Sequence, residues 1–181
     1  MFEPKTPALL LRDAQPTDAA AVARVHVLAW QTAYRGLLPD AYLDSLRPED
    51  RAKRYTFGLT DPNAPQTLVA LDGDELVGFA TVLRTRDEPT TGELSALHVL
   101  PTHWNRRIGV ALIGAARERL LRHGCSTARL WLLEGNARAE RFYRRDGWLP
   151  DGTRRSEVVW EAAVVELGFR RALPGSPPPK S

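Results

Sequence analysis

The stretch LHVLPTHWNRRIGVALI, residues 97–113, decides the fold of this chain. A strand-like run ends at Pro101, a short basic loop follows, and an apolar helix begins around Gly109. Such a loop is either an ordinary strand-to-helix turn or a cradle for phosphate groups. Free backbone N–H groups and the positive end of the helix dipole favour anions at a helix N-terminus. The stretch therefore predicts a β-loop-α unit that suits a phosphate-bearing ligand.

Strand and helix patterns alternate on both sides of this unit. Two β-branched runs flank Asp72-Gly73, a strong hairpin signal, and a helix with a Gly36 stop precedes them. The order of elements predicts a mixed α/β domain of the α+β type, whose first three neighbouring strands are antiparallel. The ranges expected as strands are 8–14, 66–84 (a hairpin), 92–100, 128–134 and 148–171 (two strands), and those expected as helices are 17–35, 38–59 (one or two), 108–123 and 136–147.

The bulk properties are those of one globular domain. The chain has 181 residues, of which 43% are hydrophobic and 26% are charged. Residues 8–171 are expected to form a single domain, between a disordered N-terminus over 1–7 and a disordered, Pro-rich tail over 172–181.

Composition also excludes several classes of function. The net charge of +3 suits an anionic ligand, but no basic tract is interleaved with aromatic residues, so we expect no nucleic-acid partner. Cys125 is the only cysteine and the four histidines lack metal-ligand spacing, so we expect no disulfide and no metal. No stretch resembles a signal peptide or approaches the roughly 18 apolar residues of a membrane span. The sequence thus predicts a cytoplasmic protein that does not bind membranes.

A second segment, NARAERFYRRDGW at residues 136–148, has the pattern of a capped helix. Asn136 is the expected cap, Phe142 and Tyr143 lie on the inner face, and Gly147 ends the helix. Its arginines are expected to form a solvated face; they are Arg138, Arg141, Arg144 and Arg145.

Together the two segments resemble the GNAT superfamily of acetyl-CoA-dependent N-acyltransferases, over about residues 8–171. Family members have a strand, usually a proline, and a loop Q/R-x-x-G-x-G/A that binds the pyrophosphate of CoA. They also have an N-x-x-A-x-x-x-Y-x-x-x-G-F/W segment, which residues 136–148 match at each specified position. The resemblance implies a GNAT fold, in which a central mixed, mostly antiparallel sheet of about seven strands is flanked by about four helices.

Two registers of the loop compete. The formula is satisfied by Arg106-x-x-Gly109-x-Ala111, but the length from strand to helix fits better with residues 104–109. We prefer the second register, which places Arg107 where the family has its first glycine. The resemblance then implies a set of acetyl-CoA-binding residues: Leu97, His98, Val99, Trp104, Asn105, Arg106, Arg107, Ile108, Gly109, Val110 and Asn136.

The resemblance also implies roles in catalysis. Tyr143 would be the general acid that protonates the departing CoA thiolate, because a phenol is neutral at pH 7. Glu93 would be the base that takes a proton from the acceptor amine; the alternative is an ordinary surface carboxylate. His98 is the second candidate base, although its side chain should point to the opposite sheet face unless a bulge intervenes.

His26, Trp30 and Tyr34 are spaced at four-residue intervals and line one stripe of the first long helix. In the family this helix forms a wall of the acceptor pocket, so Trp30 and Tyr34 are candidate substrate-binding residues; Trp131 is expected in the core. The resemblance implies direct acetyl transfer to a small-molecule amine or a peptide N-terminus, and a possible homodimer. The alternative is a non-catalytic, CoA-binding or dimerising module. A Rossmann domain is excluded because no GxGxxG motif is present.

Overall fold

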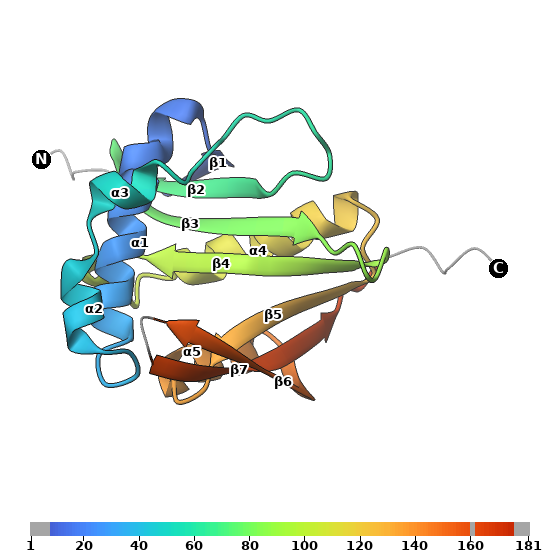
Figure 1. Cartoon of the computed structure of the whole chain (residues 1–181). Helices are drawn as coiled ribbons and strands as arrows, with labels where there is room; N and C mark the ends of the chain where they lie inside the picture. The colour runs from blue at the N-terminus through green and yellow to red at the C-terminus, as the bar shows by residue number, and fades with distance from the viewer. Residues whose placement is uncertain (1–7, 160–161, 176–181) are drawn as a thin grey trace, which may run out of the picture.

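The computed structural model describes residues 8–159 and 162–175, which fold around one seven-stranded sheet (Figure 1). The strand order is β1-β2-β3-β4-β5-β7-β6. The strands are β1 Leu10–Asp13, β2 Gln66–Asp72, β3 Glu75–Arg84, β4 Thr91–Val99, β5 Thr127–Leu133, β6 Leu149–Val159 and β7 Ala162–Ala172. The α-helices are α1 Ala19–Ala33, α2 Asp40–Ser45, α3 Pro48–Ala52, α4 Ile108–Arg122 and α5 Ala137–Arg145.

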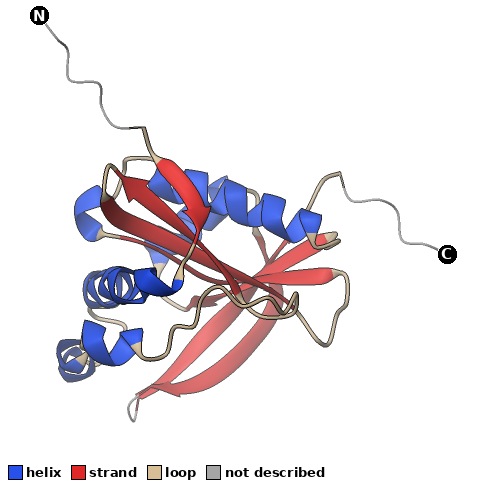
Figure 2. Cartoon of the chain, turned by 90° about the horizontal axis from the view of Figure 1, so that it is seen from above, coloured by secondary structure: helices blue, strands red, loops and turns tan. Residues whose placement is uncertain are grey.

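Helices cover both faces of the sheet. Figures 1 and 2 show α4 on one side of the strands and α1, α2 and α3 on the other. Each long helix presents an apolar stripe to the sheet: α1 buries Val22, Val25 and Ala29, and α4 buries Leu112 and Ala116. Among the described residues no helix has the length and apolar character that crossing a membrane requires.

The strands follow the predicted order, and all neighbouring pairs are antiparallel except β4 with β5. Gly73 has φ +63°, as the β2–β3 hairpin requires. The mixed, mostly antiparallel sheet predicted from the sequence is therefore confirmed. The parallel pair brackets the β4-loop-α4 unit, because parallel strands need a crossover helix between them.

A bulge in β4 changes which side chains share a face. Thr81 of β3 pairs with Ala96 but Val82 pairs with Leu94, so Ser95 is an extra residue in β4. Side chains alternate along a strand, and one extra residue reverses the alternation beyond it. His98 consequently lies on the same sheet face as Glu93, and not on the opposite face expected for a regular strand.

The two central strands diverge after a short paired region. β4 and β5 are paired only from Thr91 to Glu93 and from Thr127 to Arg129. Beyond these residues the strands separate toward the end of the sheet where α1 and α2 lie (Figure 1). The gap leaves one edge of β4, from Leu94 to Val99, without a strand partner, and this edge borders the site described below.

The core has two parts. The larger cluster lies mainly between the sheet and the long helices and includes the fully buried Phe79, Leu112, Trp148 and Phe169. The smaller cluster joins the α1–α2 region to the end of the β6–β7 hairpin; its members are Leu38, Leu43 and Val164, with Trp30, Tyr34, Tyr42, Leu46, Leu133 and Val159 packed on them. Packing of this second cluster brings segments far apart in sequence to the open end of the gap.

Two expectations about burial and boundaries need correction. β7 extends to Ala172 and Leu173 is 3% exposed, so the ordered chain continues beyond the predicted end at residue 171. Residues 1–7 and 176–181, where we predict disorder, lie outside the described residues. Trp131 is only half-buried and belongs to neither core cluster, so it is not a core residue.

Candidate active site

A cavity of about 560 Å³ lies where β4 and β5 separate. Its walls come from the unpaired edge of β4, the end of β5, the C-terminal half of α1, the loop before α4 and the inner face of α5. This volume is within the range of pockets that hold small-molecule ligands. Residues 94–99 of β4, which include Leu97, His98 and Val99, and residues 130–133 of β5 line it.

The loop before α4 turns through two left-handed residues. Asn105 has φ +64° and Arg107 has φ +63°, and α4 begins at the next residue, Ile108. Left-handed backbone is the conformation that glycine adopts most easily. Arg107 therefore stands where the register through residues 104–109 expects a glycine, and the backbone there has the geometry of one.

Most of the predicted loop residues line the cavity, namely Trp104, Asn105, Arg107, Ile108, Gly109 and Val110. Arg106 is the exception: its guanidinium lies 3.6 Å from the Asp72 carboxylate in the β2–β3 turn and is absent from the cavity wall. The loop thus sends its two adjacent arginines in different directions.

Trp104 connects three parts of the wall. Its indole N–H donates a hydrogen bond of 2.9 Å to the Val99 carbonyl, which holds the loop against the end of β4. The guanidinium carbon of Arg138, from α5, lies 3.5 Å from the centroid of the indole ring, a cation–π contact. The loop and α5 therefore meet across the cavity.

All four α5 arginines are exposed, as expected for a solvated face, and three of them also line the cavity. The three are Arg138, Arg141 and Arg145, whose i, i+3, i+7 spacing puts them on one stripe of the helix. Arg144 lies outside this stripe and forms an ion pair with Glu140 at 2.8 Å. The spacing can be read from the sequence, and it distinguishes the three arginines that line the cavity from Arg144, which does not.

Tyr143 also lines the cavity from α5. The helix starts at Asn136, whose side-chain oxygen accepts a 3.2 Å hydrogen bond from the Ala139 N–H, as the sequence predicts for a cap. Just beyond its last residue, Asp146 accepts a hydrogen bond from the buried Trp148 indole at 2.9 Å and pairs with Arg117 of α4 at 3.1 Å. These contacts at both ends fix the rotation of α5 and hence the direction of Tyr143.

The environment of Tyr143 keeps its phenol protonated. Burial raises the pKa of Tyr143 well above its ordinary value, and the nearby Tyr34 adds to the shift. Its ring meets those of Phe142 and Trp148 edge-on, at centroid distances of 5.3 and 6.2 Å. A protonated hydroxyl held in this way is able to donate a proton into the cavity.

The two candidate bases have different surroundings. Glu93 accepts a 3.0 Å hydrogen bond from Arg129 Nε and lies outside the residues that line the cavity. His98 lines the cavity, and its Nε2 accepts a 3.3 Å hydrogen bond from the Trp30 indole. Burial lowers the pKa of His98 to about 4, so its imidazole is neutral at pH 7.

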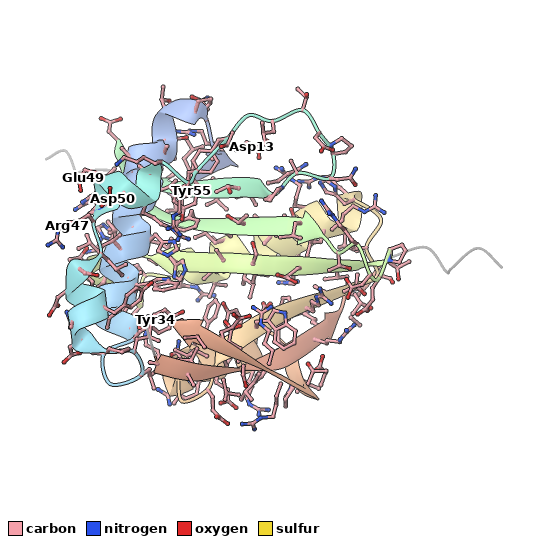
Figure 3. The ribbon with its side chains drawn as sticks, viewed as in Figure 1. Asp13, Tyr34, Arg47, Glu49, Asp50 and Tyr55 are labelled. Carbon is pink, nitrogen blue, oxygen red and sulfur yellow. The ribbon has the colours of Figure 1, made fainter. Side chains whose placement is uncertain are left out.

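The far end of the cavity is aromatic. His26, Trp30 and Tyr34 form the predicted stripe on α1, with ring centroids 4.8 and 5.0 Å apart along it. Trp30 and Tyr34 line the cavity, whereas His26 is buried behind them and its Nδ1 lies 2.7 Å from the Tyr55 hydroxyl. Figure 3 shows Tyr55 beside α3 and Tyr34 at the end of α1 that lies nearest the β6–β7 hairpin.

Sequence analysis missed two residues at this end, Trp131 of β5 and Glu166 of β7. Glu166 pairs with Leu133, which packs in the same cluster as Tyr34. Only the strand register brings Glu166 to the cavity, and no local pattern in the sequence indicates that register.

Comparisons with known proteins identify the family of this chain. The family model of the acetyltransferase (GNAT) family matches residues 22–148. The chain belongs to the GNAT family. An uncharacterized N-acetyltransferase of Bacillus subtilis, YuaI, is 32% identical over 129 residues, which are 70% of this chain and 72% of the relative. An uncharacterized N-acetyltransferase of Archaeoglobus fulgidus is 32% identical over 137 residues, or 74% of this chain and 88% of the relative.

Solved structures share the GNAT fold at low sequence identity. The PaiA N-acetyltransferase of Thermoplasma acidophilum, solved in complex with coenzyme A, is 18% identical with a TM-score of 0.71, covering 91% of this chain and 99% of the other. YncA of Salmonella typhimurium, a putative acetyltransferase solved with acetyl-CoA, is 17% identical with a TM-score of 0.70, covering 96% and 99%. The GNAT fold predicted from the two sequence segments is confirmed, and this GNAT protein is an acyltransferase.

Proposed function

We propose that this GNAT protein moves an acetyl group from acetyl-CoA directly to an amine. The observation that carries the proposal is the cavity itself, in which arginines gather at one end and a protonated tyrosine and an aromatic wall lie toward the other. A phosphate-bearing donor and an amine acceptor need such a pair of ends, with a proton donor between them.

The residues at the basic end fit CoA. Arg107, Arg138, Arg141 and Arg145 supply positive charge, and the start of α4 supplies free backbone N–H groups for the pyrophosphate. Leu97, His98 and Val99 belong to the unpaired edge of β4, whose backbone groups would pair with the pantetheine arm. The Asn136 oxygen caps α5, and its amide –NH₂ group is the part that would contact the cofactor.

The chain's own groups would handle the protons. Acetyl-CoA, when bound, supplies the acetyl group as an activated thioester. Tyr143 would donate its proton to the sulfur that leaves. Glu93 stays the predicted base, and acting from outside the cavity wall it would take the amine's proton through water. His98 is the alternative base, supported by its place in the cavity wall and its neutral imidazole.

The acceptor would lie against Trp30 and Tyr34, which suits an amine with an apolar body. Small-molecule amines and peptide N-termini both fit this description. A shared fold does not select between them, because acceptor specificity depends on the individual side chains of the pocket.

Release of free CoA thiol, measured with acetyl-CoA and a broad panel of amines, tests the proposal. We expect acetyl-CoA to raise the melting temperature, because a ligand that binds only the folded state stabilises it. We also expect at least one amine to release thiol. Binding without turnover by any amine would favour a CoA-binding module without catalysis, and absence of a melting shift would contradict both.

Glu93→Gln and His98→Gln, assayed with an amine that turns over, separate the two bases. The variant that lacks the true base should have a lower kcat at neutral pH, while acetyl-CoA should still raise its melting temperature. If neither variant slows the reaction, both assignments are wrong.

A further inference from the structure

The charges around the cavity are separated by sign. The arginines come from the α4 loop and α5, whereas Glu166 on β7 is the one carboxylate among the lining residues in the described part of the chain. Glu166 pairs with Leu133, which packs in one cluster with Trp30 and Tyr34, so the carboxylate lies near the aromatic wall. Burial raises the pKa of Tyr34 to about 12, and the negative charge of Glu166 adds to that shift. The acceptor end thus has a fixed negative charge that the proposed transfer reaction does not use.

A cation of the chain itself already lies on this carboxylate. Arg155 Nε, from β6, donates a hydrogen bond to Glu166 Oε2, and the Arg155 guanidinium carbon lies 4.4 Å from the centroid of the Trp131 ring. Trp131 and Glu166 both line the cavity, and Arg155 does not. A carboxylate beside an indole face is a combination that binds organic cations, through a charge-assisted hydrogen bond and a cation–π contact.

The Arg155 side chain is held weakly enough to be displaced. It is 43% exposed, Glu166 is 23% exposed, and β6 is an edge strand whose residues are almost all exposed. Because ion pairs at exposed positions contribute little to stability, replacing one cation by another at Glu166 requires little free energy.

We propose that Glu166 and Trp131 form a subsite for a positively charged group of the acceptor, and that Arg155, which contacts both residues without lining the cavity, competes with that group for them. The group is a guanidinium or a second ammonium, and not the amine that receives the acetyl group. The attacking amine must lose its charge, whereas a hydrogen-bonded ion pair and a cation–π contact are strongest with a group that stays charged. This inference rests on the proposed function and adds the class of acceptor, a cationic amine.

Binding measurements test the subsite without turnover. Agmatine, a four-carbon amine with a guanidinium at its far end, and n-butylamine, which lacks the guanidinium, are titrated calorimetrically into the protein alone and with excess CoA. We expect agmatine to bind the wild-type protein about tenfold more tightly, since a charged hydrogen bond contributes on the order of that factor.

Two variants break the Arg155–Glu166 pair from opposite sides. Glu166→Gln should abolish the preference for agmatine, and Arg155→Ala should strengthen agmatine binding several-fold because it removes the internal competitor. Glu157→Gln is the matched control: Glu157 also lies near Arg155, at 3.9 Å, but is absent from the cavity wall, and agmatine binding should not change.

Several results would overturn the inference. A pair that is only structural would give similar losses in Glu166→Gln and Arg155→Ala. Stronger binding of 4-aminobutanoate than of agmatine, lost in Arg155→Ala, would show an anion subsite on Arg155 instead. The inference is also contradicted if agmatine and butylamine bind the wild-type protein equally well, or if neither of them binds. The CoA-induced melting shift, measured in each variant, reports separately on folding and on the proposed function.

Discussion

The two ends of the cavity are built by different means. At the basic end the groups come from two short continuous segments, residues 104–110 and 136–145, so local sequence spacing decides where they point. At the acceptor end the groups come from α1, β4, β5 and β7, and only packing and strand register bring them together. The first end resembles a family motif, whereas the second depends on the tertiary packing of distant segments.

The comparison separates what the GNAT family shares from what sets the acceptor. A motif within one loop and one helix carries the same geometry wherever it occurs, because the backbone that positions it is continuous. An acceptor wall assembled from distant segments changes with any loop length or strand register. A substitution confined to one end should leave the properties of the other end unchanged.

The largest effect is expected where the two ends meet. Tyr143→Phe removes the proton donor and keeps the ring that packs on Phe142 and Trp148. We expect kcat to fall at least about a hundredfold, the usual contribution of a general acid, while the melting shift caused by acetyl-CoA is retained. An unchanged kcat would remove Tyr143 from the mechanism.

The basic end is tested by two arginines of α5. Arg138→Ala removes a cavity-lining charge and the contact with Trp104, and we expect KM for acetyl-CoA to rise about tenfold, as for loss of a charged hydrogen bond. Arg144→Ala is the control, since Arg144 pairs with Glu140 outside the cavity. Steady-state kinetics of both variants over a range of salt should show KM changes only in the first. If Arg138→Ala and Arg144→Ala have the same KM for acetyl-CoA, the cavity-lining arginines do not bind the cofactor.

The buried histidines at the acceptor end should make the stability of the protein depend on pH. Folding lowers the pKa of His26 to about 2 and that of His98 to about 4, because both imidazoles are desolvated. Below the ordinary histidine pKa of about 6.5 the unfolded chain therefore binds more protons than the folded chain. The folded state is consequently most stable above that pH and loses stability as the pH falls toward 4. Urea unfolding between pH 7 and 4.5 should show this loss. In His98→Gln the slope between pH 6 and 4.5 should be smaller by about 1 kcal/mol per pH unit; an unchanged slope would contradict the buried, neutral state of His98.

The smallest effect is expected at the loop turn. Arg107→Gly relieves left-handed backbone but adds freedom to the unfolded chain, so the free energy of unfolding should change by less than about 1 kcal/mol. Arg107→Ala keeps the left-handed strain, so it should be the less stable of the two in a urea titration. Both variants should bind acetyl-CoA more weakly, because both lose the cation. If the glycine variant binds as well as wild type, Arg107 is a tolerated substitution without a role in binding.

The order of elements, the sheet and most of the basic end could be predicted from the sequence, because they follow from apolar periodicity, the Asp72-Gly73 turn and contiguous motifs. The side of β4 on which His98 lies could not, because the Ser95 bulge leaves no trace in the local pattern. Glu166 could not be placed either, since its position depends on the pairing of β5 with β7. The stripe of Arg138, Arg141 and Arg145 and its exposure were predictable from the spacing, whereas its position beside the cavity depends on how α5 packs.

The most direct test of the two-ended cavity is the distance between the Tyr143 hydroxyl oxygen and the CoA sulfur in a crystal structure of the complex. We expect the two atoms to lie within hydrogen-bonding reach, about 3.5 Å or less, or to be joined by one bridging water, with the pyrophosphate at the Arg107–Gly109 turn. A sulfur well beyond the reach of one water, or a pyrophosphate bound away from this turn, would contradict this expectation.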